Sequence, residues 1–335
     1  MKRKTLKFNI VLILFISALV LFSGCNNRGF VPNESVQLHV ENYYTVDGLI
    51  HDFKDAQNPQ ILSESIALYL QYLAFVGDAE RFQQQVDILA DNFIVHHNDE
   101  IFVKWILRDN ITVNALIDDL RIAEALISAA NRFNEPSYHD LADDIIQAIK
   151  SNMIINGSLR DFYDWHYGLA YSELFLSYYN VALMEYYNFP DAVFEPLEQL
   201  IAAPFFLERY VNGSLLPSNP IEVNMIDQSL IAIAYFERMG QVEPNFQQFL
   251  EERLAEDGKI FARYYRDTGI NSNENQSSAV YAFLLHYFEL TGQSANAEKT
   301  RTLLRQMETF NPITTHFFDF INKELALISG LRLSW

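Results

Sequence analysis

The chain of 335 residues contains one cysteine, Cys25, so intrachain disulfides are excluded and stability must come from a packed core. Glycine and proline are also scarce, at 12 and 10 residues, and they form no long linker between domains. Basic residues are outnumbered, with 24 lysines and arginines against 43 acids and a formal net charge of −19. Because nucleic-acid binding depends on neutralising phosphates, we expect no nucleic-acid partner.

The signatures of several enzyme classes are missing. The sequence has no glycine-rich phosphate loop and no serine nucleophile elbow. His96 and His97 are adjacent, the other histidines are scattered, and none has the spacing of metal ligands. We therefore expect neither a metal nor a cofactor, and we interpret the histidines as structural.

The N-terminus has the pattern of an export signal. Basic residues between Lys2 and Lys7 precede an apolar run that ends in Ser23-Gly24-Cys25, the pattern of a bacterial lipoprotein whose cysteine is lipidated. The alternative is an ordinary signal peptide with a chance cysteine. We predict a signal over 1–24, a lipidated tether over 25–34 and a single domain over 35–335. Without the four basic residues of the signal the charge is near −23, so the lipid must anchor a body that anionic membranes repel.

Five tight turns, each followed by an aliphatic residue, recur along the chain. They start at Asp47, Asp99, Asn156, Asn212 and Asp257, at steps of 52, 57, 56 and 45 residues. Four carry an Asn-Gly or Asp-Gly pair, which tolerates positive φ. A repeat near 50 residues indicates one stacked supersecondary unit, here a short extended piece and two helices. About six units fit the chain, which predicts an all-α (α/α)6 toroid with short β-like connections, expected to be a monomer.

The helices are predicted in pairs, in which a helix that is apolar nearly all round is followed by an amphipathic one. The apolar helices are expected inside the ring and the amphipathic ones outside. The predicted pairs are 63–75 with 79–94, 116–133 with 137–149, 168–187 with 196–210, 225–239 with 244–254, and 277–291 with 295–310. The tail over 314–328 is predicted to close the ring with a helix near 36–43.

Acidic residues stand where the predicted inner helices begin. Glu64 lies in the first turn after Ser63, Asp118 and Asp119 open the second inner helix, and Asp227 opens the fourth. Helix capping explains any one of them, since the free N–H groups of a first turn favour acids. Three of them, however, are embedded in apolar helix starts, where a buried charge without a partner is costly. The constellation therefore predicts carboxylates that face a cleft.

Paired carboxylates across an aromatic cleft suit glycoside hydrolysis. One carboxyl must carry a proton for the leaving oxygen, and the other must stay ionised to activate water or attack carbon. Tyrosine and tryptophan side chains near the helix starts could stack on sugar rings, although packing would explain each of them as well. The candidates for substrate contact beside the acids are Tyr163, Trp165, Tyr167, Arg263, Tyr264 and Tyr265.

At these residues the chain resembles the family 8 glycoside hydrolases, most closely the short exopolysaccharide-associated members. Ser63-Glu64-Ser65 is similar to the family's Ser-Glu-Gly-Gln-Ser, whose glutamate is the general acid, and residues 115–126 resemble its Ala-Thr-Asp-Ala-Asp-Leu signature. The resemblance spans about residues 40–310. It implies a toroid, an acid at Glu64, a base at Asp227, and a sugar held at the cleavage point by Asp118 or Asp119.

The chain also departs from this pattern. Ile66 and Ala67 replace the Gln-Ser part of the acid motif, and an ungapped match puts Ile117 on the first aspartate of the signature. We predict a lipid-anchored, extracytoplasmic, inverting endo-hydrolase of a β-linked polysaccharide. The first alternative is a glycan-binding lipoprotein on the same fold that has lost hydrolysis. The second is another toroid enzyme, such as a polysaccharide lyase, which the acidic charge disfavours.

Overall fold

The computed structural model describes residues 34–53, 58–311 and 313–329. By its contacts the chain divides into two compact units, residues 1–32 and 33–335, and the description below concerns the second. The predicted signal, its cleavage site and Cys25 lie outside the described residues. The α-helices are α2 (Glu34–Tyr43), α3 (Ser63–Val76), α4 (Ala79–Asn92), α5 (Leu116–Phe133), α6 (Ser137–Asn152), α7 (Val181–Tyr186), α8 (Glu195–Glu198), α9 (Met225–Met239), α10 (Pro244–Glu256), α11 (Ser278–Leu290), α12 (Ser294–Gln306) and α13 (Phe317–Ser329).

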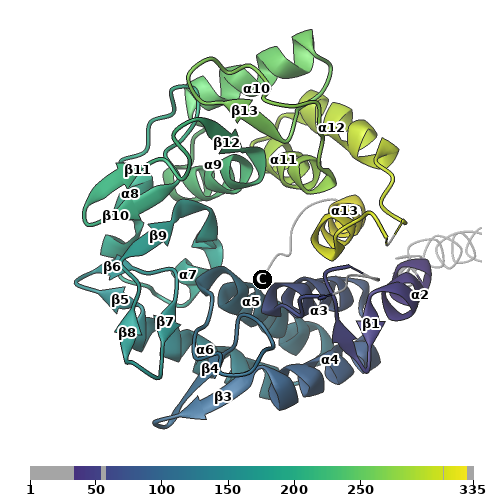
Figure 1. The fold of residues 1–335 in the computed structure, drawn as a ribbon, viewed down its shortest axis with the longest axis vertical. Coiled ribbons are helices and arrows are strands. Elements are labelled where there is room, and N and C mark those ends of the chain that lie inside the picture. The colour runs from purple at the N-terminus through teal and green to yellow at the C-terminus, as the bar shows by residue number, and fades with distance from the viewer. Residues whose placement is uncertain (1–33, 54–57, 312, 330–335) are drawn as a thin grey trace, which may run out of the picture. The chain divides into compact units, whose positions relative to one another are not determined.

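The helices of this unit form an (α/α)6 toroid, as the repeat predicted. Figure 1 shows α3, α5, α9, α11 and α13 around the centre, with α4, α6, α10 and α12 outside them. The inner helices are apolar because both of their sides are covered, and α3 has twelve buried residues among its fourteen. The outer helix α4 buries only Phe82, Gln85, Val86 and Leu89.

The two ends of the unit close the ring, as predicted. Tyr44, which follows α2, packs edge-on against Phe317 of α13 and donates a hydrogen bond to the carbonyl of Thr315. His39 of α2 lies against Phe320 of α13, with ring centroids 4.9 Å apart. The first and last described helices therefore form the sixth pair.

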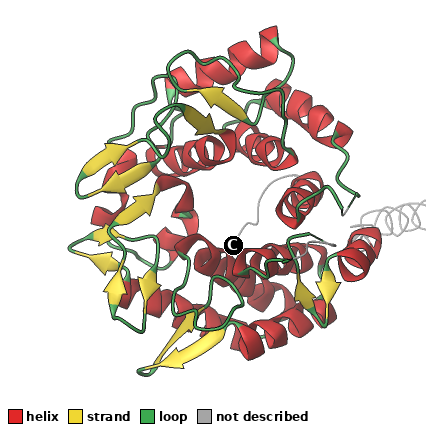
Figure 2. Ribbon diagram, viewed as in Figure 1, coloured by secondary structure: helices red, strands yellow, loops and turns green. Residues whose placement is uncertain are grey.

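The connections carry short antiparallel strands, drawn as yellow arrows in Figure 2. Four of the five predicted turns join hairpins in which two successive residues have positive φ, such as Asp47 and Gly48. The second of these turns is Asn98-Asp99, one residue earlier than predicted. The fifth is not a hairpin, because Asp257 caps α10 and only Gly258 has positive φ. The hairpins pair β1 (Thr45–Val46) with β2 (Leu49–Ile50), β3 (Ile94–His97) with β4 (Glu100–Val103), β5 (Ile154–Ile155) with β6 (Ser158–Leu159), and β10 (Arg209–Val211) with β11 (Ser214–Leu216).

The third predicted pair of helices, 168–187 with 196–210, is wrong in its extent. The first segment contains β8 (Leu169–Ala170), β9 (Glu173–Phe175), the 3₁₀ helix η1 (Leu176–Tyr178) and the short α7. β9 pairs with β10, which takes backbone groups that a longer helix would need. Asn180 then caps α7 by accepting from the N–H of Leu183, so the helix can begin only there. In the second segment only the four residues of α8 are helical, with Pro196 in the first turn, and Pro204 would interrupt any helix that ran through it.

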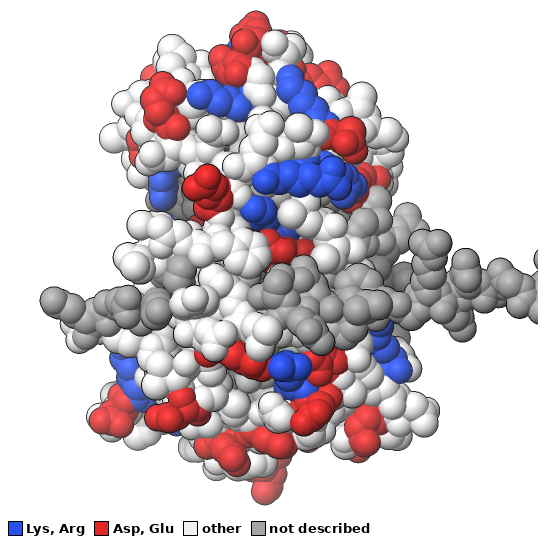
Figure 3. Space-filling view, turned by 90° about the vertical axis from the view of Figure 1, so that its right-hand side faces the viewer, with Lys and Arg blue, Asp and Glu red and all other residues white. Residues whose placement is uncertain are grey.

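Two further strand pairs flank the helix starts. β7 (Tyr163–Asp164) pairs with β8, and β12 (Glu222–Asn224) pairs with β13 (Arg263–Tyr265). Among the described residues, no helix has the length and apolar character needed to cross a membrane. Acidic and basic side chains are interspersed on the face of the molecule in Figure 3.

Candidate active site

A cluster of charges links the first turns of α3 and α5. Nη1 of Arg121 lies 3.0 Å from Oε1 of Glu64 and 3.6 Å from Oδ1 of Asp118. The hydroxyl of Ser63 donates to Oδ2 of Asp118 at 2.8 Å. The exposed fractions of the side chains are 26% for Glu64, 8% for Asp118 and 10% for Arg121, so Glu64 is the member that solvent reaches most. One cation thus contacts two carboxyl groups at the starts of neighbouring inner helices.

Asp118 is buried enough to retain a proton near neutrality. Burial raises its pKa to about 7, and the nearby charge of Glu64 acts in the same direction. The charge of Arg121 and the hydrogen bonds from Ser63 and from the backbone of Glu64 oppose this rise. Asp118 therefore keeps its proton to a higher pH than an ordinary aspartate.

The side chain of Asp119 points away from Glu64 and Arg121, toward Asn114. Its Oδ2 accepts a 2.6 Å hydrogen bond from Nδ2 of Asn114, whose side-chain Oδ1 accepts from the N–H of Tyr163. Its Oδ1 is buried without a partner among the described residues. Burial raises the pKa of Asp119 well above its ordinary value. The structure thus places Asp118, and not Asp119, beside Glu64.

Asp227 lies in the first turn of α9, where Asn224 caps the helix. Its Oδ1 accepts a 2.9 Å hydrogen bond from the hydroxyl of Ser177 in η1. Burial raises the pKa of Asp227, while Ser177 and the charge of Arg263 oppose the rise. Asp227 and Glu64 thus both stand at starts of inner helices, α9 and α3.

Tyr178 lies near both Asp118 and Asp227. Burial raises its pKa, and the charges of Asp118 and Asp227 both add to that effect. Its side chain therefore lies within electrostatic range of both aspartates. Tyr178 also lines a cavity of about 320 Å³ that all the inner elements enclose, with Arg121 and Ser177 in the same wall. Glu64, Asp118 and Asp227 do not line this cavity themselves, but Arg121 and Ser177, their partners, do.

The aromatic residues predicted to stack on sugar rings differ in their solvent exposure. Tyr167 and Tyr265 are 71% and 39% exposed. Trp165 is only 5% exposed and stacks on Phe102, with ring centroids 5.3 Å apart, and Tyr163 stacks on the same ring. Tyr264 is 1% exposed. Open ring faces are thus present at Tyr167 and Tyr265, while the other three aromatic rings pack against the protein.

Arg263 lies on β13, opposite Asn224 of β12, and its residue is exposed. Its charge lowers the pKa of Asp227, which places its side chain near that carboxyl. Of the predicted substrate contacts, Arg263 is thus the one the structure brings into electrostatic range of Asp227.

Several residues at the site carried no predicted role, among them Ser177, described above. Trp105 is 38% exposed, and its carbonyl accepts from the N–H of Ser63 at the start of α3. Arg121 stands three residues after Asp118, a spacing that puts both on one helix face and could have suggested a pair. Tyr178 lies in the segment 168–187, which the sequence predicts as a long helix.

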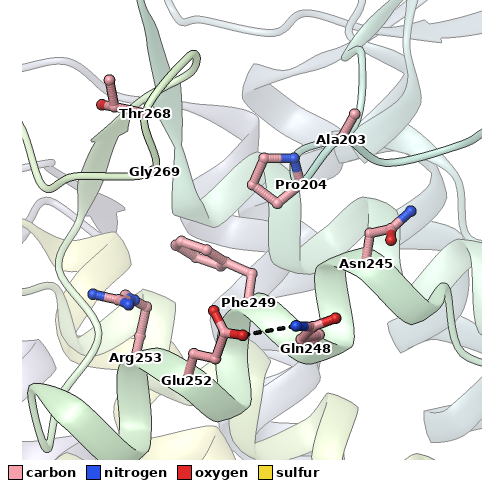
Figure 4. Close-up of a pocket in the computed structure, with 9 residues that line it drawn as sticks. All are labelled: Ala203, Pro204, Asn245, Gln248, Phe249, Glu252, Arg253, Thr268 and Gly269. Carbon is pink, nitrogen blue, oxygen red and sulfur yellow. Dashed lines mark hydrogen bonds between the residues drawn. The ribbon is translucent and has the colours of Figure 1, made fainter.

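A second hollow lies far from these carboxylates in sequence. It is a shallow groove beside α10 of about 390 Å³, shown in Figure 4. Phe249 and the pair Gln248 and Glu252, joined by a 2.7 Å hydrogen bond, lie along the helix. It contains none of the predicted site residues. The described residues also include no group of three or more His, Cys, Asp or Glu side chains that could hold a metal ion.

The chain is similar to proteins of known structure over nearly all of its length. PssZ from Listeria monocytogenes is 47% identical, with a TM-score of 0.86 over 88% of this chain and 94% of PssZ. Endoglucanase Cel10 of Klebsiella pneumoniae, a family 8 glycosyl hydrolase, shares the fold at 13% identity, with a TM-score of 0.62 over 89% of this chain and 98% of Cel10. YdaJ of Bacillus subtilis (strain 168), whose name describes it as a candidate lipoprotein, is 26% identical over 93% of this chain and 91% of YdaJ. No family model matches the chain.

Proposed function

Because the chain belongs to the family 8-like glycoside hydrolases, we propose that it is an inverting, endo-acting hydrolase of a β-linked polysaccharide outside the cell. Glu64 donates the proton to the glycosidic oxygen, Asp227 deprotonates the attacking water, and Asp118 holds the sugar at the cleavage point. The observation that carries this proposal is the position of Tyr178, within electrostatic range of both Asp118 and Asp227 at one side of the ring cavity. Arg121, which pairs with Glu64, and Ser177, which donates to Asp227, line the same cavity and support this assignment.

The roles follow from the surroundings of each carboxyl. Glu64 is the more exposed partner of the acid cluster, so its free oxygen can reach a sugar in the cleft. Asp227 is held by Ser177 through one oxygen, which orients the carboxylate and leaves the other oxygen for water. In an inverting enzyme such a water is activated on the opposite face of the sugar ring from the acid.

Reducing-end release by the full chain tests this function. The purified protein is offered a panel of β-linked and α-linked glycans and exopolysaccharide, beside the variants Glu64→Gln and Glu80→Gln. Glu80 is the matched control, because it is the second residue of the outer helix α4 as Glu64 is of α3, and it is exposed. We expect E64Q to lose a factor of about 10² to 10⁴ in kcat and E80Q to cleave normally. Strong cleavage by E64Q would remove Glu64 from the role of acid, and proton NMR of the first product would show the α-anomer if the β-linkage is inverted.

One observation favours the alternative of a glycan-binding lipoprotein without hydrolysis. Arg121 pairs with Glu64, and an ion pair favours the carboxylate, whereas a general acid must be protonated. This alternative predicts that wild-type protein binds a glycan in the panel and releases no reducing ends from it.

The proposed location is the outer side of the cell membrane, with lipid on Cys25. The name of YdaJ and the signal pattern support it. The full chain is expected in the membrane fraction and Cys25→Ser in a form that detergent-free buffer extracts. Equal retention of both proteins in membranes would contradict lipidation at Cys25.

A further inference from the structure

Arg121 occupies a position that the proposed mechanism does not use. Its guanidinium is 10% exposed, contacts Glu64 and Asp118 through one nitrogen, and lies 5.9 Å from the ring centre of Phe318 in α13. The same side chain lines the central cavity. Arg121 of α5 therefore lies against α3, through Glu64, and against α13, through Phe318.

One bound proton makes the cluster of Glu64, Asp118 and Arg121 electrically neutral. Two carboxylates and one guanidinium carry a net charge of −1, and a single proton on either carboxyl makes the set neutral. A buried set is most stable when its charges cancel, because uncompensated charge is costly away from water. Asp118 is the more buried of the two acids, and it is fixed by Ser63, while Glu64 has only Arg121 as a side-chain partner among the described residues.

We infer that Arg121 is a positioning residue that orients Glu64 and sets the pH at which the Glu64–Asp118 pair gives up its shared proton. This inference rests on the proposed function, because it gives the pair the proton that Glu64 would deliver. Asp118 is the carboxyl of the pair whose pKa burial raises, and Arg121 holds Glu64 through the ion pair.

Other titrating groups surround Arg121 and define the controls. Glu124 lies one turn further along α5, and the charge of Arg121 lowers its raised pKa, which is about 7. Tyr178 of η1 lies within the electrostatic range of Arg121, Asp118 and Asp227. His286 of α11 lines the same cavity, and burial lowers its pKa. Of these neighbours, Glu124 is the one that titrates in the same range, so its contribution must be removed separately.

The first test measures kcat against pH on a cleaved glycan for wild type, Arg121→Gln and Arg121→Lys. Loss of the cation lets the acid pair keep its proton to higher pH, so the alkaline limb of R121Q is expected to move up by about one pH unit. R121K keeps the charge and should leave the limb close to that of wild type, with a lower kcat because one point charge orients Glu64 less well. An alkaline limb that stays in place in R121Q would overturn the inference.

The second test needs no activity and therefore separates failure of this inference from failure of the proposed function. The melting temperature is measured from pH 5 to pH 8.5 for wild type and R121Q, each also in an E64Q and an E124Q background. The decrease in melting temperature caused by R121Q should grow with pH, since unpaired carboxylates form at high pH. The same decrease should be smaller in the E64Q background. A pH-independent loss, or one that disappears only in the E124Q background, would assign Arg121 to packing or to Glu124. Circular dichroism at pH 5 checks that each variant is folded.

Discussion

Two adjacent aspartates on α5 show how much one residue step changes a carboxyl group. Asp118 faces α3 and is held by Ser63 and Arg121, whereas Asp119 turns to Asn114 in the loop before the helix. The direction follows from helix geometry, because consecutive side chains point about 100° apart. Both pKa values are raised by burial, but only Asp118 has a cation in contact.

The matched variants Asp118→Asn and Asp119→Asn test this division. We expect D118N to lose at least a factor of about 10² in kcat/KM on a cleaved glycan, because the carboxyl group proposed to position the sugar is replaced. D119N should stay within a few-fold of wild type, because its side chain points away from the cluster. Similar losses in the two variants would contradict the assignment of Asp118.

The sequence predicts candidate acids but not their partners. Asp118, Asp119 and Asp227 are conspicuous because they lie in apolar helix starts, and Glu64 because it lies in the first turn after Ser63. Choosing between Asp118 and Asp119 required the rotation of α5 relative to α3, which no local pattern contains. Tyr178 could not be identified for a similar reason, since η1 follows β9, whose partners on β10 lie 34 to 38 residues further along the chain.

At the level of elements, the sequence predicts helices well where their periodicity is long. The boundaries of α5, α9 and α11 lie within one residue of those predicted. The segment over 168–187 was predicted wrongly because its tyrosines and leucines fit a helix and a strand equally well. In this segment the pairing with β10 and the cap at Asn180 determine where the strand ends and the helix begins. The pairing with β10 is a tertiary contact, which the local sequence does not reveal.

The hairpin turns allow a prediction with a built-in control. Gly48 and Gly213 both have a φ of +83°, and each is the second residue of a two-residue turn. A Cβ at Gly213 would meet nothing within 4 Å, whereas one at Gly48 would lie 2.7 Å from Cδ1 of Ile88 in α4. We expect Gly213→Ala to cost about 1 kcal/mol of unfolding free energy from the left-handed backbone alone.

Gly48→Ala should cost more than that, because Ile88 must also change its rotamer, which adds on the order of 1 kcal/mol. Urea unfolding of both variants measures the difference. Equal losses would mean that Ile88 moves aside freely and that the hairpin packs loosely on α4.

At the scale of the whole molecule, carboxyl groups inside the ring oppose its stability at neutral pH. Burial raises the pKa of Glu124, Asp161 and Glu237 to about 7, as it does that of Asp118. The chain also has a formal net charge of −19, so self-repulsion increases as these groups ionise. Both effects have the same sign, and both follow from burying carboxyl groups in an acidic protein.

Thermal stability is therefore expected to fall as the pH rises from about 5 to about 8. In this range the unfolded chain has already released these protons, since ordinary carboxyl pKa values are near 4, while the folded protein still binds them. Each retained proton makes the unfolding free energy decrease by on the order of 1 kcal/mol per pH unit until the folded pKa near 7 is passed. Calorimetry of the double variant Glu124→Gln, Glu237→Gln should give a shallower slope, because Gln is close in size to Glu and cannot ionise. The exposed variant Glu80→Gln should leave the slope unchanged, and a melting temperature that rises between pH 5 and pH 8 would show that the surface ion pairs outweigh the buried acids.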